Sequence, residues 1–553
     1  MHVIDWIIIV VYLIGLIGLS RYLSRRQFDV EDYYLGGRRL SWWAVGLSTM
    51  ATQLSAVSFV SAPAFVALKP GGGLIWLGYE FAVPLAVLFL MIVFLPVYHR
   101  TRVMSIYEYL EKRFDAGTRT LVSLVFQISR AMATGVTIFA VSIVISATVG
   151  IPLWVTILIT GVVTLIYDAW GGMRAVIYSD VLQMIILMVG IVLCGLEAYE
   201  RVGGWDHVVQ SLSPERFQTI DWAGHGFGDG RDFGFWPLAI GGFFLYASYY
   251  GCDQSQMQRE LSVAHVDDGR RSLMFNGFVR FPIVVGYCFM GLFIGAFALR
   301  SREFAAMIPS EHVDYMVPLF VVHYLPAGVT GFILMAILAA AMSSLDSALN
   351  SLSAATMSDL YQRYINPRAS QREYLLWSKI ITVMWGVICV GFAFVVGRIS
   401  GTVIEIINKV GSLFYGPILA TFVLGMLTRT TSGRGVKVGL LVGVGVNFVL
   451  WAGFPGISWL WWNAIGCLVT LGVGYGLSRL WPSRRPPAST LWARDERTPR
   501  DEALDRASGS EDADARPDSR EAASGRDWRW RYVALGVYFF LIIFIAHLIG
   551  QIK

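Results

Sequence analysis

Long hydrophobic runs separated by short polar segments make up most of the chain. A helix needs about 20 residues to cross a bilayer, so apolar runs of roughly 17 to 25 residues are candidate spans. The pattern predicts an all-α membrane protein of about 14 transmembrane helices, surrounded by a lipid bilayer. The predicted spans are residues 3–20, 41–67, 73–98, 117–148, 151–169, 175–200, 234–258, 274–299, 316–355, 374–397, 402–427, 435–453, 457–480 and 530–551.

Basic residues occur mainly in every second loop. The loops after the odd-numbered runs are rich in Arg and Lys, as around Arg38, Arg100 and Arg270, whereas the short loops after even-numbered runs carry few. Because short cytoplasmic loops hold an excess of Lys and Arg, the odd-numbered loops are predicted to be cytoplasmic. With an even number of spans both termini then face outwards, in a plasma (inner) membrane.

Composition agrees with this location and narrows the function. The 553 residues are 55% hydrophobic and 15% charged, with a mean hydropathy of +0.57, which is too apolar for a soluble protein of this size. The net charge of +5 comes largely from loop residues that set topology, so it indicates no nucleic-acid partner. The five cysteines lie in apolar or small-residue segments and indicate no disulfide framework.

One segment near the C-terminus has a different composition. Residues 483–526 open with SRRPPAST and later read ASGSEDADARPDSREAASG, with few large apolar side chains. Such a segment cannot bury enough apolar surface to fold. It predicts a disordered cytoplasmic linker over 483–529 that leads to the last span, and both a solvated insertion and a regulatory segment fit this composition.

The run from Ala339 to Ser351 is unusually polar for a long hydrophobic helix. At helical spacing Ala340, Ser343 and Ser344 share one face, and Asp346 follows three residues after Ser343 on the same side. Hydroxyl and carbonyl oxygens are the ligands that a small hard cation prefers. Small residues with Ser also occur wherever membrane helices pack closely, so the pattern alone leaves both explanations open.

The second and seventh runs are also interrupted by polar residues. The second carries six Ser, Thr or Gln residues between Ser48 and Ser58, and the seventh reads YASYYGCDQSQMQR from Tyr246. Irregular backbone at membrane depth is tolerated where it lines a cavity and can coordinate an ion. Two interrupted helices five spans apart are what an inverted five-plus-five repeat requires.

These motifs resemble a known family. The sequence AAAMSSLDSALNS from Ala339, followed by MSDLY from Met357, is similar to the eighth core helix of the sodium/solute symporter family, and the resemblance covers about residues 1–480. It implies a LeuT-like five-plus-five inverted repeat and Na+ as the coupling ion, with no organic cofactor. By this resemblance the sodium site comprises the Ser343 and Ser344 hydroxyls with Ala340 and the carbonyls of Ala51 and Leu54. Asp180, in its Asp-x-x-Gln setting, is assigned to the path of the ion, and Asp346 to that path or to a second ion.

The substrate site follows from the same resemblance, and its chemistry stays open. Positions similar to Glu80, Gln254 and Asn408 contact a sugar in sugar carriers, but Ser58 and Tyr246 stand where such carriers have amides. The stretches SIYEYLEKRF and GGMRAV look more like the branch that carries iodide and monocarboxylates. The predicted substrate-binding residues are Ser58, Glu80, Tyr246, Tyr249, Tyr250, Gln254 and Asn408.

Together these features predict a sodium-coupled secondary symporter that imports a small polar solute and functions as a monomer. The alternatives are a transporter-like sensor and a symporter of a small organic or inorganic anion. No phosphate-binding loop, His-Glu-x-x-His motif or nucleophile elbow is present in the sequence, so an enzyme is not expected.

Arg130, at the midplane of the fourth run, requires an acid or a ligand anion, and Asp346 is one potential partner. The predicted units are 1–40 (first span and loop), 41–200 (first repeat), 201–233 (external loop), 234–430 (second repeat), 431–482 (two further spans), 483–529 (linker) and 530–553 (last span).

Overall fold

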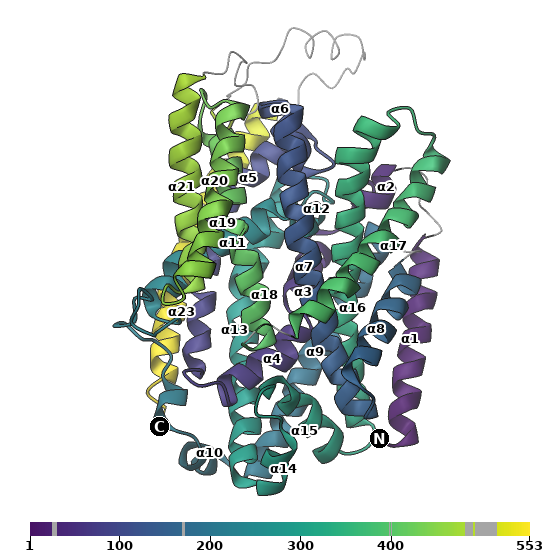
Figure 1. The fold of residues 1–553 in the computed structure, drawn as a ribbon, viewed down its shortest axis with the longest axis vertical. Coiled ribbons are helices and arrows are strands. Elements are labelled where there is room, and N and C mark those ends of the chain that lie inside the picture. Colours follow the sequence, from purple (N-terminus) through teal and green to yellow (C-terminus); the bar gives the residue numbers. More distant parts are fainter. Residues whose placement is uncertain are drawn as a thin grey trace.

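The computed structural model describes residues 1–24, 30–168, 172–397, 399, 401–481, 490–492 and 517–552. Most helices run along the long axis of the molecule and pack side by side, with little irregular structure between them (Figure 1). They are α1 (Val3–Ser24), α2 (Val30–Leu35), η1 (Gly36–Arg38), α3 (Trp42–Gln53), α4 (Ala56–Ala67), η2 (Leu74–Glu80), α5 (Val83–Thr101), α6 (Ile106–Arg113), α7 (Ala116–Val149), α8 (Leu153–Asp168), α9 (Met173–Val202), α10 (Trp205–Ser211), η3 (Pro214–Phe217), η4 (Pro237–Gly241), α11 (Gly242–Cys252), α12 (Gln254–Glu260), α13 (Val266–Arg300), α14 (Arg302–Met307), η5 (Val313–Tyr315), α15 (Met316–Tyr324), α16 (Val329–Ala355), η6 (Thr356–Ile365), α17 (Gln371–Val396), α18 (Val403–Ser412), α19 (Tyr415–Leu427), α20 (Gly433–Gly453), α21 (Trp459–Leu480) and α23 (Pro517–Ile549).

The structure confirms an all-helical membrane protein, but it does not confirm a count of 14 spans. Among the described residues, 10 helices are long and apolar enough to cross a membrane, or 12 if each of two bent pairs forms one span. The predicted fifth span is not among these helices, because its helix, α8, has 16 residues. The predicted seventh falls short because the chain breaks between α11 and α12 at Asp253.

The predicted ninth span, residues 316–355, is divided in the structure. Leu325 is extended after α15, and Gly328, at a φ of 88°, precedes the first residue of α16. Pro326 lies between them and cannot continue the ladder of backbone hydrogen bonds. The membrane-crossing part is therefore Val329–Ile365, formed by α16 and η6.

Two pairs of half-helices are bent at short breaks. Helices α3 and α4 meet at 52°, and α18 and α19 meet at 40°. At the first break Ser55 is extended and its side chain accepts a hydrogen bond from Val57 N–H, so it caps the second half-helix. At the break between α11 and α12, Asp253 accepts from Ser255 N–H in the same way. Each break leaves the last carbonyls of one half-helix without helical partners.

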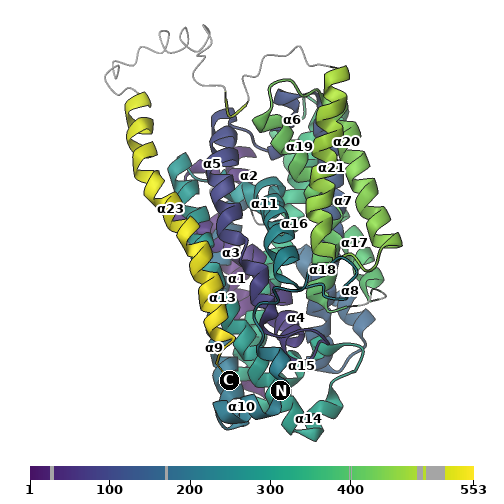
Figure 2. The ribbon, with the colours of Figure 1, turned by 90° about the vertical axis from the view of Figure 1, so that its left-hand side faces the viewer.

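Helix α16 lies at the centre of the bundle. In its most apolar window 89% of the residues are buried, compared with 17% for the C-terminal helix α23, which lies along the outside against α5 and α13 (Figure 2). A helix that carries many hydroxyl groups is thus shielded from lipid, where its polar groups would find no hydrogen-bond partners.

The two chain termini lie at the same end of the molecule, opposite α2 and α6 (Figures 1 and 2). This agrees with an even number of crossings; the side that they face stays a prediction. Helix α23 begins at Pro517, inside the segment 483–529 predicted to be a linker. Residues 482–489 and 493–516 of that segment lie outside the described residues, so its disorder also stays a prediction.

Candidate functional site

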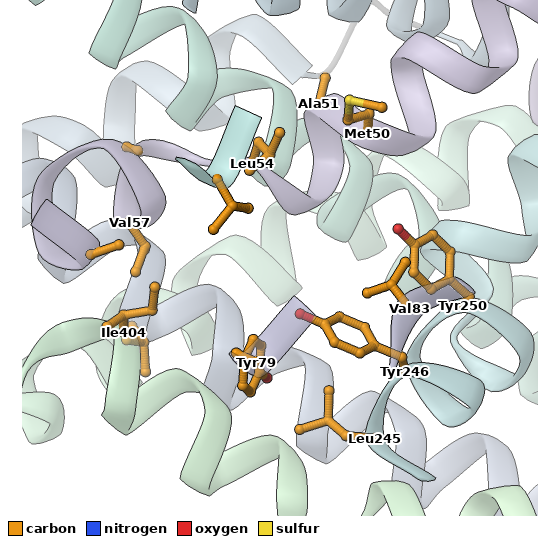
Figure 3. Packing of buried hydrophobic residues seen from close by; sticks show 14 of the residues in the cluster. Met50, Ala51, Leu54, Val57, Tyr79, Val83, Leu245, Tyr246, Tyr250 and Ile404 are labelled. Carbon is orange, nitrogen blue, oxygen red and sulfur yellow. The ribbon is translucent and has the colours of Figure 1, made fainter. Parts of the chain in front are cut away.

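The end of α3 lies against the middle of α16. Ser344 Oγ is 3.4 Å from the carbonyl oxygen of Thr52 and 3.3 Å from that of Ala340. Thr52 precedes the break, as do Ala51 and Gln53, and Figure 3 shows Ala51 near the end of α3 and Leu54 where the two half-helices separate. The break therefore brings backbone carbonyls and a helix hydroxyl together, which is the kind of ligand set that a sodium ion takes.

Ser343 belongs to a second cluster of polar groups beside this one. Its hydroxyl donates to Asp180 Oδ1 at 2.5 Å, and Ser48 of α3 donates to Asp180 Oδ2 at 2.5 Å. Arg259 of α12 forms an ion pair with Asp180 at 3.0 Å, and both side chains are fully buried. Arg259 also donates to Ser48 at 2.7 Å and to Ser347 of α16. Asp180 thus connects α9, α3, α12 and α16 on the side of α16 that carries Ser343.

Asp346 is buried on α16, with 3% of its surface exposed. Of the partners that the sequence left open for Arg130, the structure gives an acid other than Asp346. Arg130 Nη1 lies 3.3 Å from Asp253 Oδ2, at the break between α11 and α12. Asp253 can pair with Arg130 because its two carboxylate oxygens have different roles. Oδ1 caps α12, and Oδ2 faces Arg130 on α7.

A cavity of about 90 Å³ lies beside the break in the second predicted span. Of the predicted substrate-binding residues, Ser58, Glu80, Tyr246, Tyr249 and Asn408 line it, together with Arg130. Tyr246 and Tyr79 contact each other with ring centroids 5.2 Å apart (Figure 3), and Tyr79 donates a 2.8 Å hydrogen bond to Asn408. The cavity wall is therefore aromatic with a few fixed polar groups, as ligand cavities commonly are.

Two of the predicted substrate residues lie elsewhere. Gln254 accepts a 2.9 Å hydrogen bond from Ile106 N–H and donates to Met104 O at 3.2 Å, so it holds the start of α6 against α12. Tyr250 is buried but does not line the cavity. Both lie near the break at Asp253, where a change of chain direction turns neighbouring side chains to different surroundings.

Arg280 of α13 lines the cavity and was not singled out from the sequence. It forms an ion pair with Glu80 through two hydrogen bonds, one of them 3.0 Å from Nη2 to Oε1. Tyr246 completes the group: its hydroxyl donates to Glu80 at 3.0 Å, and its ring lies 5.0 Å from the guanidinium carbon. The available signal was an arginine inside the predicted eighth span, since ionisable residues at membrane depth are functional candidates.

Two guanidinium N–H groups beside this cavity have no hydrogen-bond partner among the described residues. They are Arg280 Nη1 and Arg130 Nε, and both side chains are more than nine-tenths buried. A buried N–H group without a partner costs about 1–3 kcal/mol. Both arginine side chains line the cavity, so a negatively charged ligand there would lie beside two guanidinium groups.

A wider cavity of about 670 Å³ lies beyond the aromatic wall. Phe233 lines this outer cavity, and its ring lies 6.0 Å from that of Trp76, which lines the smaller one. Trp76 in turn stacks on Tyr79 at 4.9 Å. Helix α18 borders both spaces, with Asn408 in the inner one and Glu405 and Lys409 in the outer one. Aromatic rings thus separate the two cavities.

A multi-pass helical bundle with interrupted helices, an oxygen-rich cluster at one break and a cavity beside it is typical of a secondary transporter. The profile of the sodium:solute symporter family matches residues 33–443, so the chain belongs to that family and is a sodium-coupled solute symporter. It is a transporter and not an enzyme, and Na+ is its coupling ion.

Curated relatives and solved structures agree with this assignment. The human sodium/iodide cotransporter is 30% identical over 79% of this chain and 67% of its own length. The mouse sodium-coupled monocarboxylate transporter 2 is 27% identical over 77% and 68%, and the sodium/sialic acid symporter NanT of Aliivibrio fischeri is 26% identical over 85% and 92%. A Na+-coupled sialic acid symporter, solved with substrate in an outward-open state, superposes with a TM-score of 0.76 at 24% identity, covering 88% of this chain and 100% of that one. The nucleobase-cation symporter MHP1 superposes at 0.51 with 13% identity, covering 85% and 98%. The predicted LeuT-like fold is confirmed.

Proposed function

We propose that this symporter imports a small anionic solute together with sodium, and that Arg280 and Arg130 bind the negative charge of the solute. The observation that carries the proposal is the pair of unsatisfied guanidinium N–H groups beside one cavity of about 90 Å³. An anion in this cavity would be attracted by both guanidinium charges, and an accepting atom that reached either N–H group would offset the penalty for leaving it buried and unpaired.

The charges around the empty cavity favour an anionic substrate that binds together with a cation. Arg280 is paired with Glu80, and Arg130 with Asp253, so these four charges cancel before a ligand binds. An anion that enters adds an uncompensated negative charge to a buried site, which is expensive without a cation. Sodium bound at the adjacent helix break would supply that cation, and this gives a physical reason for coupling.

The sodium site in this proposal consists of the residues predicted for it. Ser344 and Ala340 are already adjacent to the end of α3, and Ser343 lies one residue before Ser344. Ala51 and Leu54 flank Thr52 at the break and would supply carbonyl oxygens. Gln53, Ser55 and Ser58, from the same break, line the substrate cavity. Binding of either ligand would thus organise the backbone that the other one contacts.

The relatives named above support an anionic substrate. Their names specify iodide, monocarboxylates and sialic acid, all of which carry a negative charge at neutral pH. The cavity of about 90 Å³ has room for several water-sized groups, which suits the smaller of these anions. We therefore favour a short monocarboxylate or a monoatomic or small inorganic anion over a sugar.

We extend the proposal to orientation, organisation and assembly. Arg38 ends η1, and Arg270 and Arg271 lie in the first turns of α13. The positive-inside rule assigns these basic segments to the cytoplasm, and both termini would then lie outside the plasma membrane. The interrupted helices α3–α4 and α11–α12 head two repeats, 41–200 and 234–430. We also propose that the transporter functions as a monomer.

Uptake into proteoliposomes tests the proposal. The purified protein is reconstituted, and an inward sodium gradient drives uptake of labelled acetate, lactate, pyruvate, iodide or glucose, with potassium replacing sodium as the blank. We expect sodium-dependent uptake of at least one anion and competition among anions of similar size. Sodium-dependent glucose uptake that no anion inhibits would reject the anionic substrate while leaving sodium coupling intact.

A further inference from the structure

Glu260, the last residue of α12, is a buried carboxyl group that joins three helices. It is 1% exposed. Thr49 of α3 donates a 2.8 Å hydrogen bond to its Oε1 atom, and Ser272 of α13 donates to the same atom at 2.9 Å. The second oxygen, Oε2, is buried and has no partner among the described residues. The group thus holds α3, α12 and α13 together through one of its two oxygens.

The charged and titratable groups around Glu260 do not neutralise it. Arg259 uses its guanidinium on Asp180, Ser48, Ser255 and Ser347. His99 of α5 approaches the backbone oxygen of Glu260 with its ring, at 3.3 Å, and not the carboxyl group. Tyr250 of α11 contributes a neutral phenol, and the contacts from α3 and α13 are the two neutral hydroxyls.

An ionised carboxylate is therefore poorly stabilised in this position. A buried charge without a paired base is strongly disfavoured, and the protonated form becomes the stable one. Burial raises the pKa of Glu260 to about 7, against the lowering effect of the Thr49 and Ser272 hydrogen bonds and the charge of Arg259. Glu260 lies just beyond the predicted seventh span and outside the long apolar helices.

We propose that Glu260 is a proton-binding site on the cytoplasmic side, occupied while α3, α12 and α13 are packed together and vacated when they separate. Helices α3 and α12 are the inner halves of the two interrupted helices, and Thr49 lies two residues before Ala51. Passage from the cavity to the cytoplasm requires the contacts between these halves to open. Opening removes the Thr49 or Ser272 bond and admits water to both carboxyl oxygens, so the proton leaves.

The consequence is that acid on the cytoplasmic side opposes opening. In the packed arrangement the group binds its proton with a pKa of about 7, and in a solvated arrangement with its ordinary value of 4.5. By linkage, opening becomes less favourable by up to about tenfold for each pH unit below 7, and it is independent of pH well above 7. The inference rests on sodium symport and not on the charge of the substrate, so it can fail or succeed separately from the anion proposal.

The test measures initial sodium-driven uptake in proteoliposomes at a fixed external pH of about 7.5, with the internal pH set between about 5.5 and 8.5. We expect wild-type uptake to fall as internal pH decreases below about 7. Glu260→Gln keeps the two hydroxyl bonds and cannot ionise, so its uptake should not depend on internal pH over this range. Glu108→Gln serves as the control, because Glu108 lies in α6, towards the same end of the molecule, and pairs with Lys112 at 2.9 Å; it should keep the wild-type profile.

A second variant covers the case in which Glu260→Gln does not fold. Ser272→Ala removes one hydrogen bond that stabilises the carboxylate, so the midpoint of the pH profile should move to higher pH. The same pH profile in wild type and Glu260→Gln, or an unshifted midpoint in Ser272→Ala, would overturn the proposal. Internal sodium is varied at constant pH in parallel. If the difference in uptake between wild type and Glu260→Gln follows internal sodium and not internal pH, the site binds sodium and the proton assignment is wrong.

Discussion

Ser343 Oγ donates a 2.5 Å hydrogen bond to Asp180 Oδ1, and this bond joins the central helix α16 to α9. A hydroxyl group has one proton and two lone pairs. Because the proton of Ser343 is held by Asp180, its lone pairs remain available to a cation. The carboxylate therefore positions the serine that the proposed sodium site requires, without having to contact the ion itself.

The first prediction concerns the two serines. Ser343→Ala or Ser344→Ala should raise the sodium concentration for half-maximal uptake by roughly tenfold, since one lost oxygen contact costs about 1–2 kcal/mol. Ser351→Ala, two turns further along α16, removes a hydroxyl whose partner among the described residues is Ala348 O, and it should leave sodium activation unchanged. Equal sodium curves in all three variants would place the ion elsewhere.

The buried pair of Asp180 and Arg259 gives a second prediction. Asp180→Asn or Arg259→Gln alone leaves one buried charge unpaired, and each should lower the free energy of unfolding by about 3–5 kcal/mol. The double variant should lose less than the sum of the single ones, because neither charge remains. Thermal unfolding in detergent, with and without sodium, gives the coupling energy. Strictly additive losses would show that the two groups act independently.

The third prediction addresses Arg280 and Glu80. Arg280→Lys keeps the charge but loses the planar fork, and should raise KM for the anion by about tenfold or more. Glu80→Gln removes a competing carboxylate and should lower KM for the anion, at some loss of stability because Arg280 is then buried without its partner.

Arg300→Gln is the matched control for Arg280, since Arg300 is exposed at the end of the same helix. Uptake kinetics at saturating sodium separate KM from the maximal rate. A rise of KM in Glu80→Gln equal to that in Arg280→Lys would show that Glu80 contacts the substrate directly and is not only the partner of the arginine.

Asp346 supplies the fourth prediction. If its carboxylate contributes to a second ion site, Asp346→Asn should lower the sodium Hill coefficient from about two towards one. Arg130 already pairs with Asp253, so the effects of Arg130→Gln and Asp346→Asn on uptake should be additive. Flux ratios of sodium to substrate in wild type and Asp346→Asn decide the matter. One sodium per substrate in both proteins would exclude the second ion.

The sequence was most informative where polar groups interrupt apolar helices. Ser343 and Ser344 were singled out because hydroxyls at membrane depth need a purpose and a family motif surrounds them, and Leu54 was added from the family resemblance. The seventh predicted span was expected to be interrupted, and the break occurs at Asp253, which caps α12. Local sequence indicated an interruption there without deciding which side chain would end it.

The contacts that were not predicted connect residues far apart in the chain. Glu80 was chosen as a cavity residue, but its partner Arg280 lies 200 residues later and no local pattern links them. Gln254 was assigned to the cavity from its depth, although depth along an axis does not fix the direction of a side chain once the helix has broken. The count of 14 spans is not confirmed among the described residues, where α8 and α11 are apolar but shorter than the runs that contain them.

The paired charges of the cavity determine how the transporter should respond to membrane voltage. Moving one elementary charge through 100 mV is worth about 2.3 kcal/mol. Arg130 with Asp253 and Arg280 with Glu80 sum to zero, so the empty cavity contributes no net charge when access shifts from one side of the membrane to the other. With respect to these four residues, the voltage dependence of transport then comes from the charges of the bound sodium ions and solute. The rate at which the unloaded cavity returns should not depend on the membrane potential.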